Sequence, residues 1–315
     1  MGSVSKIKEI SKPDFWVKLG KVAWQSALNF MDDNCMKMSA SLAYYTIFSI
    51  GPLILIVSWL IGFLYGQHFE NTGTENQILK ELNHLFGEKI TLLIQNTLEN
   101  LKISSNSKTG IVVGTLTLLF TSTTVFVEIQ DSINTIWGIK PKPKKNWLKF
   151  ILNRLISLSM VLGLGFLLIA SLMINSIILI LMNYFNQIIP GISNNMLEII
   201  NTSLTLVIIA AIFSFIFKFL PDAKVRNRDI MIGAVFTTIL FMFGRYGISV
   251  YLQYNATASA FGAAGAVILL LLWVYFSAAI LYYGAEFTKE HSKIFGKGII
   301  PASFAVRVSR KEEEI

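Results

Sequence analysis

The 315-residue chain is 53% hydrophobic and only 15% charged, which excludes an ordinary soluble protein and favours one whose main solvent is lipid. The net charge of +8 raises nucleic acid as a partner, but that interpretation requires basic residues on one folded surface, and here they lie between apolar segments. The single cysteine, Cys35, excludes an intramolecular disulfide, and the three histidines lack metal-ligand spacing, so we expect neither a metal nor a cofactor.

Residues 1–41 are predicted to form a cytoplasmic segment that carries an amphipathic helix. Its less polar residues recur every three or four positions, at Phe15, Leu19, Val22, Ser26 and Phe30. Lysines occupy other positions of the helical turn, an arrangement typical of a helix that lies along the inner membrane interface. We therefore expect this segment to touch the membrane ahead of the first span.

Six apolar runs follow, each long enough to cross a hydrocarbon core of about 30 Å as a helix of roughly 20 residues. They cover residues 42–65, 110–133, 155–181, 197–217, 230–252 and 263–287. Because lipid cannot satisfy free backbone groups, each run is predicted to be helical. The predicted fold is all-α and polytopic: residues 42–287 form one six-helix transmembrane domain, and residues 288–315 form a charged cytoplasmic tail.

Residues 66–109, between the first two runs, are predicted to lie outside the membrane. Apolar residues recur there at helical spacing between Leu79 and Leu93, which favours an amphipathic helix or helical hairpin that caps the external face. The alternative is a mobile external loop.

The distribution of lysine and arginine predicts the orientation. Of the 27 basic residues, 22 lie in residues 1–41, 139–154, 218–229 and 288–315. The connections on the other side are almost free of them, and residues 182–196 and 253–261 contain none. By the positive-inside rule both termini face the cytoplasm.

The second run has one polar face along its whole length, since small and polar residues follow each other at steps of three or four. These residues are Gly110, Gly114, Thr117, Thr121, Thr124, Glu128, Asp131 and Thr135. Polar groups at membrane depth are costly unless they meet water, a ligand or each other, so this face is a candidate polar track. The alternative is a packing seam that lets helices approach closely.

Two other runs carry candidate lining residues. Ser41, Tyr45 and Ser49 align at steps of four before Pro52, where a kink is expected. Glu286 ends the last run at its inner end and is either functional or merely interfacial.

Arg245 lies inside the fifth run, about 22 Å from its inner end at 1.5 Å per residue, and therefore past the midplane. A direct ion pair with Glu128 or Glu286 is not expected, because both carboxylates lie near the inner surface. One interpretation is that Arg245 extends its guanidinium to the outer interface. The other is that it faces a hydrated cavity and binds an anion such as a lipid phosphate.

Three segments carry a resemblance to a known family. They are residues 39–53 (SASLAYYTIFSIGPL), residues 219–226 (FLPDAKVR) with Gly233 and Ala234, and Tyr246 and Gly247 with residues 272–286 (LWVYFSAAILYYGAE). Together and in this order they resemble the YihY/virulence factor BrkB family of bacterial inner-membrane proteins. The resemblance implies a multi-pass protein of the bacterial cytoplasmic membrane. Members have carried the label ribonuclease BN, generally regarded as a misassignment, and others are linked to serum resistance or to lipid movement.

The resemblance supplies no catalytic residues, and the sequence itself argues against an enzyme. It has no clustered carboxylates for two metals, no histidine pair for acid and base chemistry, and no nucleotide-binding glycine motif. The expected function is movement of a lipid-like or anionic amphiphile, such as an envelope lipid or a lipopolysaccharide precursor, with membrane lipids as partners. The alternative is a structural or scaffolding membrane protein without a transport pathway.

Overall fold

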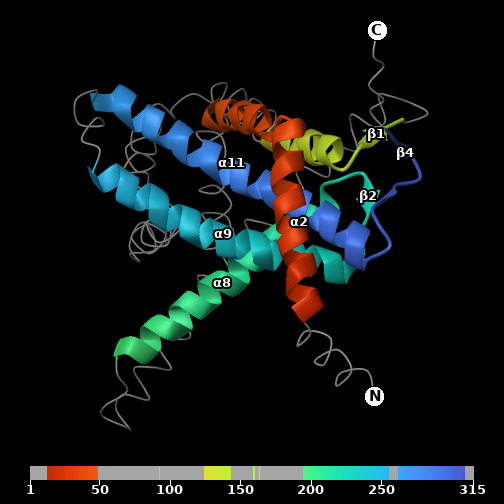
Figure 1. Ribbon diagram of the computed structural model, residues 1–315. Helices are drawn as coiled ribbons and strands as arrows, with labels where there is room; N and C mark the ends of the chain where they lie inside the picture. The colour runs from red at the N-terminus through yellow and green to blue at the C-terminus, as the bar shows by residue number, and fades with distance from the viewer. Residues whose placement is uncertain are drawn as a thin grey trace, which may run out of the picture.

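The computed structural model describes residues 13–48, 92, 124–142, 159, 163, 194–254 and 262–308. Its named helices are α2 (Pro13–Asp32), α8 (Asn194–Phe219), α9 (Asn227–Tyr254) and α11 (Gly262–Phe295), and residues 35–48 and 124–136 are also helical. Four short strands complete the order: β1 (Ile139–Pro141), β2 (Ala223–Lys224), β3 (Ile300–Pro301) and β4 (Ala305–Arg307). The described part of the chain is therefore mainly helical, as predicted (Figure 1).

Three of these helices are long and apolar enough to cross a membrane. The qualifying stretches are Thr202–Phe219 in α8, Asn227–Ile248 in α9 and Ile268–Phe295 in α11, and they coincide with the predicted fourth, fifth and sixth spans. Large apolar side chains stay exposed on them, with Phe243 and Tyr246 at 72% and 73% exposure, as expected for helices that face lipid. The predicted external cap, except Leu92, and most of the first three spans lie outside the described residues.

Helix α9 packs against both α8 and α11 (Figure 1). It meets α11 through two reciprocal contacts, here called the Gly–Thr seam. A Cβ on Gly233 would overlap the Thr288 hydroxyl, and a Cβ on Gly284 would overlap the Thr237 hydroxyl. Each threonine donates its hydroxyl, over 2.7 Å, to the carbonyl of the glycine four residues earlier on its own helix. The two glycines thus let the helices approach closely, while the threonine hydroxyl groups keep their hydrogen bonds.

The predicted N-terminal helix is confirmed as α2, and Figure 1 shows it crossing α11 steeply. The periodic face identified in the sequence packs on the protein: Val22, Ser26 and Phe30 are buried, and Phe30 meets the Tyr283 ring edge-on at 6.0 Å. A second apolar stripe, which includes Trp24 and Met31, is exposed. The location of α2 at the membrane surface stays a prediction. The apolar stripe that is free to contact lipid is not the one that the sequence pattern identified.

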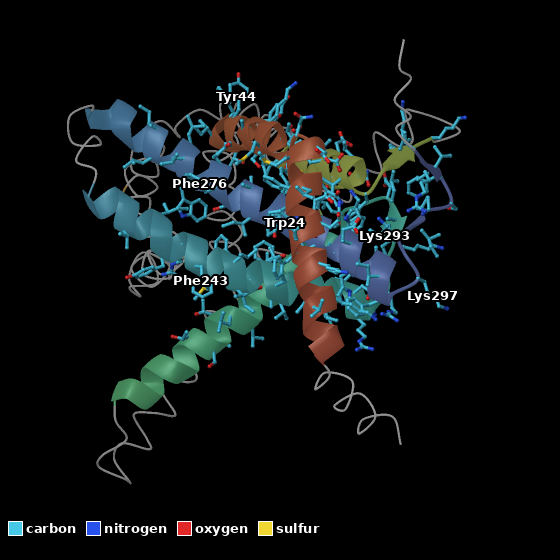
Figure 2. All side chains as sticks on the ribbon, viewed as in Figure 1. Trp24, Tyr44, Phe243, Phe276, Lys293 and Lys297 are labelled. Atoms are coloured by element: carbon cyan, nitrogen blue, oxygen red, sulfur yellow. The ribbon has the colours of Figure 1, made fainter. Side chains whose placement is uncertain are left out.

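The strands form two antiparallel ribbons, β1 with β4 and β2 with β3, at one end of the helices, here called the strand end. β1 lies between the second predicted span and the third, β2 between the fourth and the fifth, and β3 and β4 in the tail after the last. In Figure 2, Lys293 and Lys297 lie at the strand end, whereas the exposed aromatic residues Phe243 and Phe276 lie along the helices. The tail predicted to follow the last span is thus folded back onto the loops.

Candidate functional site

A cleft of about 580 Å³ opens at the strand end. It is lined by residues from four separate parts of the chain: the corner after α2, the end of helix 124–136 with β1, the last turns of α11, and β4. The charged lining residues are Asp33, Asp131, Lys140, Lys289 and Arg307. Among the described lining residues, three cations and two carboxylates give a net charge of +1. One wall is apolar and includes Ile136, Trp137 and Val308.

The β1–β4 wall of the cleft follows from the way helix 124–136 ends. Gly138 has φ of +65°, a left-handed conformation that suits glycine, and its amide donates to the Thr135 carbonyl over 3.0 Å. The chain then enters β1, where Ile139 pairs with Arg307 of β4. The Gly138 carbonyl accepts from the Val308 amide at 2.8 Å, so the turn also holds the tail in place.

A buried carboxylate fixes helix 124–136 to the loop before α9. The Asp222 side chain accepts hydrogen bonds from the amide groups of Gln130 and Asn134, each at 3.1 Å, and its own backbone amide donates to Asn134 Oδ1 at 2.9 Å. All three residues are buried. Because charge-assisted hydrogen bonds are among the stronger ones, this triad holds helix 124–136, which ends in the cleft wall, against the loop before α9. Trp137 adds a bond from its indole nitrogen to the Ala285 carbonyl, at 3.1 Å.

The floor of the cleft is a cluster of charged groups drawn from the two ends of the chain. Asp33 occupies the corner between α2 and helix 35–48, next to Asn34, whose φ of 55° allows the sharp change of direction. Lys289 Nζ lies 3.3 Å from Asp33 Oδ2 and 2.9 Å from Glu286 Oε2. The Glu286 side chain is fully buried, whereas Lys289 and Asp33 retain 25% and 17% exposure. Glu286 therefore lies directly behind the solvent-facing pair.

A second polar cluster, with Asp229 and His291 buried and Arg226 exposed, joins the start of α9 to the end of α11. Arg226 donates to Asp229 Oδ1 at 2.9 Å, and His291 Nδ1 lies 3.2 Å from the same oxygen without hydrogen-bond geometry. Asp229 is in the first turn of α9, where a carboxylate is favoured by the helix dipole. The cluster ties the two helices together beside the cleft and does not line it.

The structure distributes the predicted site residues over several places. Asp131 and Thr135, from the predicted polar face, are exposed and line the cleft, whereas Thr124 and Glu128 are half-buried. Ser41 is half-buried and Tyr45 is 38% exposed. Thr117, Thr121 and Ser49 lie outside the described residues.

Arg245 is half-buried on α9 and is not part of the cleft lining. Its neighbour Gly244 packs against Ile280, six residues before Glu286, a separation of roughly 9 Å along a helix. Within the described residues no ion pair forms on Arg245, so the structure does not bring it together with Glu286 or Glu128.

The sequence pattern does not by itself identify several residues of the cleft region. Gln130 and Asn134 are spaced four apart and face the opposite side of the helix from the predicted polar track, and that spacing was a usable signal. Lys289 and Arg307 were counted only as orientation signals. Among the described residues, no group of three histidine, cysteine or acidic side chains is placed to hold a metal ion.

The buried thiol of Cys35 lies near the charged floor of the cleft, formed by Asp33, Glu286 and Lys289. Burial, with the nearby carboxylates of Glu286 and Asp33 adding to it, raises the pKa of Cys35 to about 12. The thiol is therefore protonated at neutral pH and is unsuited to nucleophilic chemistry.

Comparison with known proteins identifies relatives among bacterial membrane proteins. A UPF0761 membrane protein of Tolumonas auensis is 27% identical over 262 residues, which cover 81% of this chain and 80% of the relative. One from Klebsiella pneumoniae is 30% identical over 199 residues, 62% of this chain and 64% of the relative. One from Pseudomonas aeruginosa is 25% identical over 266 residues, and the match spans 82% of this chain but only 60% of that longer protein.

No solved structure matches the chain. The family model described as virulence factor BrkB matches residues 26–298, a range that contains the three segments on which the resemblance rests. It also contains most of the cleft, including Asp33, Asp131 and Lys289. With membrane proteins as relatives and three helices of spanning length, the chain is a membrane protein that belongs to the virulence factor BrkB family.

Proposed function

We propose that the protein moves an anionic amphiphile across the bacterial cytoplasmic membrane and that the cleft at the strand end receives the anionic headgroup. The observation that carries the proposal is the lining of the cleft. Lys140 and Arg307 are both exposed at its edge, and the net charge of +1 suits a phosphate monoanion. A guanidinium is well matched to phosphate geometry, and an ammonium serves as a point charge beside it.

The position of the cleft supports the same proposal. In the proposed orientation the strand end faces the cytoplasm, because it carries lysines and arginines from every described loop, whereas residues 246–288 contain none. A headgroup in the cleft is then at the inner membrane surface. Beside it Val308 is exposed, with Ile136 and Trp137 buried behind the lining, and this apolar side offers contact for the first part of an acyl chain.

A scaffolding role is the second candidate, and a specific feature favours it. The polar groups between α9 and α11 are interlocked in the Gly–Thr seam, and the Asp222 triad joins helix 124–136 to the same unit. Small and hydroxylated residues used in this way hold helices together without a pathway.

A lipid-translocation assay separates the two candidates. The protein is reconstituted into vesicles with a fluorescently labelled phosphatidylglycerol or phosphatidylcholine, and a membrane-impermeant reductant quenches the label in the outer leaflet. The proposal expects protein-dependent loss of the protected fraction for the anionic lipid, slowed in the double variant Lys140→Gln and Arg307→Gln. Lys297→Gln removes an exposed cation that is not among the cleft-lining residues and is the matched control. Protected fractions equal to those of protein-free vesicles for both lipids favour the scaffold.

A further inference from the structure

The charged floor of the cleft contains an imbalance that points to a bound proton. Among the residues that the structure describes, two carboxylates, Glu286 and Asp33, share the one ammonium of Lys289. The same Lys289 nitrogen lies 3.3 Å from Asp33 and 2.9 Å from Glu286, so the two carboxyl groups are close enough to act on each other electrostatically. Two carboxylates that share a site do not both ionise readily, because each destabilises the charge of the other.

The two oxygen atoms of Glu286 differ in their surroundings. Oε2 accepts the 2.9 Å hydrogen bond from Lys289, whereas no donor among the described residues reaches Oε1, which is buried. A fully buried carboxylate oxygen without a donor is costly when charged. A proton on this carboxyl group removes the charge and supplies an O–H group that can donate to Asp33.

We propose that Glu286 and Asp33 share one proton and that this proton exchanges with water through the cleft. In the exchange a lone pair of the Glu286 carboxylate accepts a proton from a hydronium ion in the cleft, which leaves as water, and on release the proton passes to a water molecule to give hydronium again. Asp33 and Lys289 are the partly exposed groups that line the cleft and connect Glu286 with solvent. The site is therefore a proton-binding site on the strand-end side of the bundle, and it stands whether or not an amphiphile is moved.

Titratable groups from several neighbouring elements surround this site. Lys289 on α11 and Asp33 at the corner after α2 act on Glu286 directly, and the Cys35 thiol on helix 35–48 interacts with all three. Tyr282 on α11 interacts with Cys35 and with Glu128 on helix 124–136, one step further from Glu286. Lys289 is the cation of the set, so its single positive charge is offset by Asp33 alone when Glu286 is protonated. The proton thus makes the floor of the cleft electrically neutral.

Infrared spectroscopy of the full-length protein in lipid vesicles tests the proposal. The wild-type protein is expected to show a carboxylic-acid C=O band at neutral pH that shifts after transfer to D₂O and disappears on alkalinisation. Glu286→Gln is expected to lack the band. Glu290→Gln changes a buried glutamate on the same helix that already accepts from Asn29 and Lys293, and it is expected to keep the band.

Asp33→Asn is the second variant in this test. If Glu286 had only a structural role, this substitution would not change the carboxylic-acid band. With one carboxylate and one ammonium left, Glu286 is expected to ionise and the band to be lost, while the circular dichroism spectrum stays helical. A wild-type spectrum without a Glu286-dependent acid band at neutral pH overturns the proposal. So does a band that persists unchanged in Asp33→Asn or that fails to shift in D₂O.

Discussion

The Gly–Thr seam predicts how much stability the protein loses when the packing of α9 against α11 is disturbed. In Gly284→Ala the new Cβ would overlap the Thr237 hydroxyl and lie 2.8 Å from both Cβ and Cγ2 of Thr237. Overpacking of this kind costs about 1–3 kcal/mol, loss of the threonine hydrogen bond about 1 kcal/mol, and the better helix propensity of alanine returns about 1 kcal/mol. The expected net loss of stability is about 1–3 kcal/mol.

Reversible unfolding in mixed detergent micelles, titrated with sodium dodecyl sulfate and followed by circular dichroism, measures this loss. Gly247→Ala on α9 is the matched control, because a Cβ there meets nothing within 4 Å and only the propensity gain applies. Adding Thr237→Gly to Gly284→Ala restores the space and is expected to recover part of the loss, as a coupling between the two positions. Equal unfolding midpoints for Gly284→Ala and Gly247→Ala would refute the close approach of α9 and α11.

Three further predictions concern the region of the cleft. Asp222→Ala leaves the buried amides of Gln130 and Asn134 without their acceptor and is expected to lower the free energy of unfolding by about 2–4 kcal/mol in the same assay. Asp222→Asn is expected to lower it less, because the Gln130 amide can rotate and present its oxygen to the new amide group. A loss equal for both variants contradicts the triad. Gly138→Ala should destabilise more than Gly298→Ala: both glycines have positive φ, but only the first would place a Cβ within contact of the tail, 3.2 Å from the Val308 carbonyl oxygen. Cys35 should resist maleimide labelling at neutral pH until the protein is denatured, since the thiol is buried and its pKa is raised to about 12. Rapid labelling of the folded protein would contradict the burial of this thiol.

Helix existence was predictable from the sequence because lipid allows so few alternatives. The three described spans and α2 are helices where hydropathy and periodicity placed them. Periodicity also identified the face formed by Val22, Ser26 and Phe30, but it could not tell a lipid partner from a protein partner. Whether this face is buried against α11 or against lipid depends on how α2 crosses α11. The spacing of apolar residues is the same in both cases, so the sequence does not distinguish them.

The sequence predicts that small residues let some helices approach closely, but not at which residues. Gly244 and Gly247 both lie on α9, but only the first approaches another helix: Gly244 packs against Ile280, whereas a Cβ on Gly247 would meet nothing within 4 Å. The tightest contacts lie at Gly233 and Gly284, because a threonine on the facing helix fills each gap. Which glycine faces a partner depends on the register between two helices, which a single chain does not encode locally.

The cleft could not be predicted, because its floor joins groups that are far apart in the chain. Asp33 and Lys289 are 256 positions apart, and Arg307 reaches the cleft only because β4 pairs with β1. Glu286 was identified as a candidate from its place at the end of a span. Its burial behind Lys289 follows from the turn at Asn34, which brings Asp33 onto α11.

Native mass spectrometry of the protein released from mixed-lipid micelles tests the headgroup site most directly. The account predicts that phosphatidylglycerol stays bound in preference to phosphatidylcholine, and that the double variant Lys140→Gln and Arg307→Gln loses this preference while Lys297→Gln keeps it. Equal retention of both lipids by the wild-type protein, or a preference that survives in the double variant, would contradict a cleft that selects anionic headgroups.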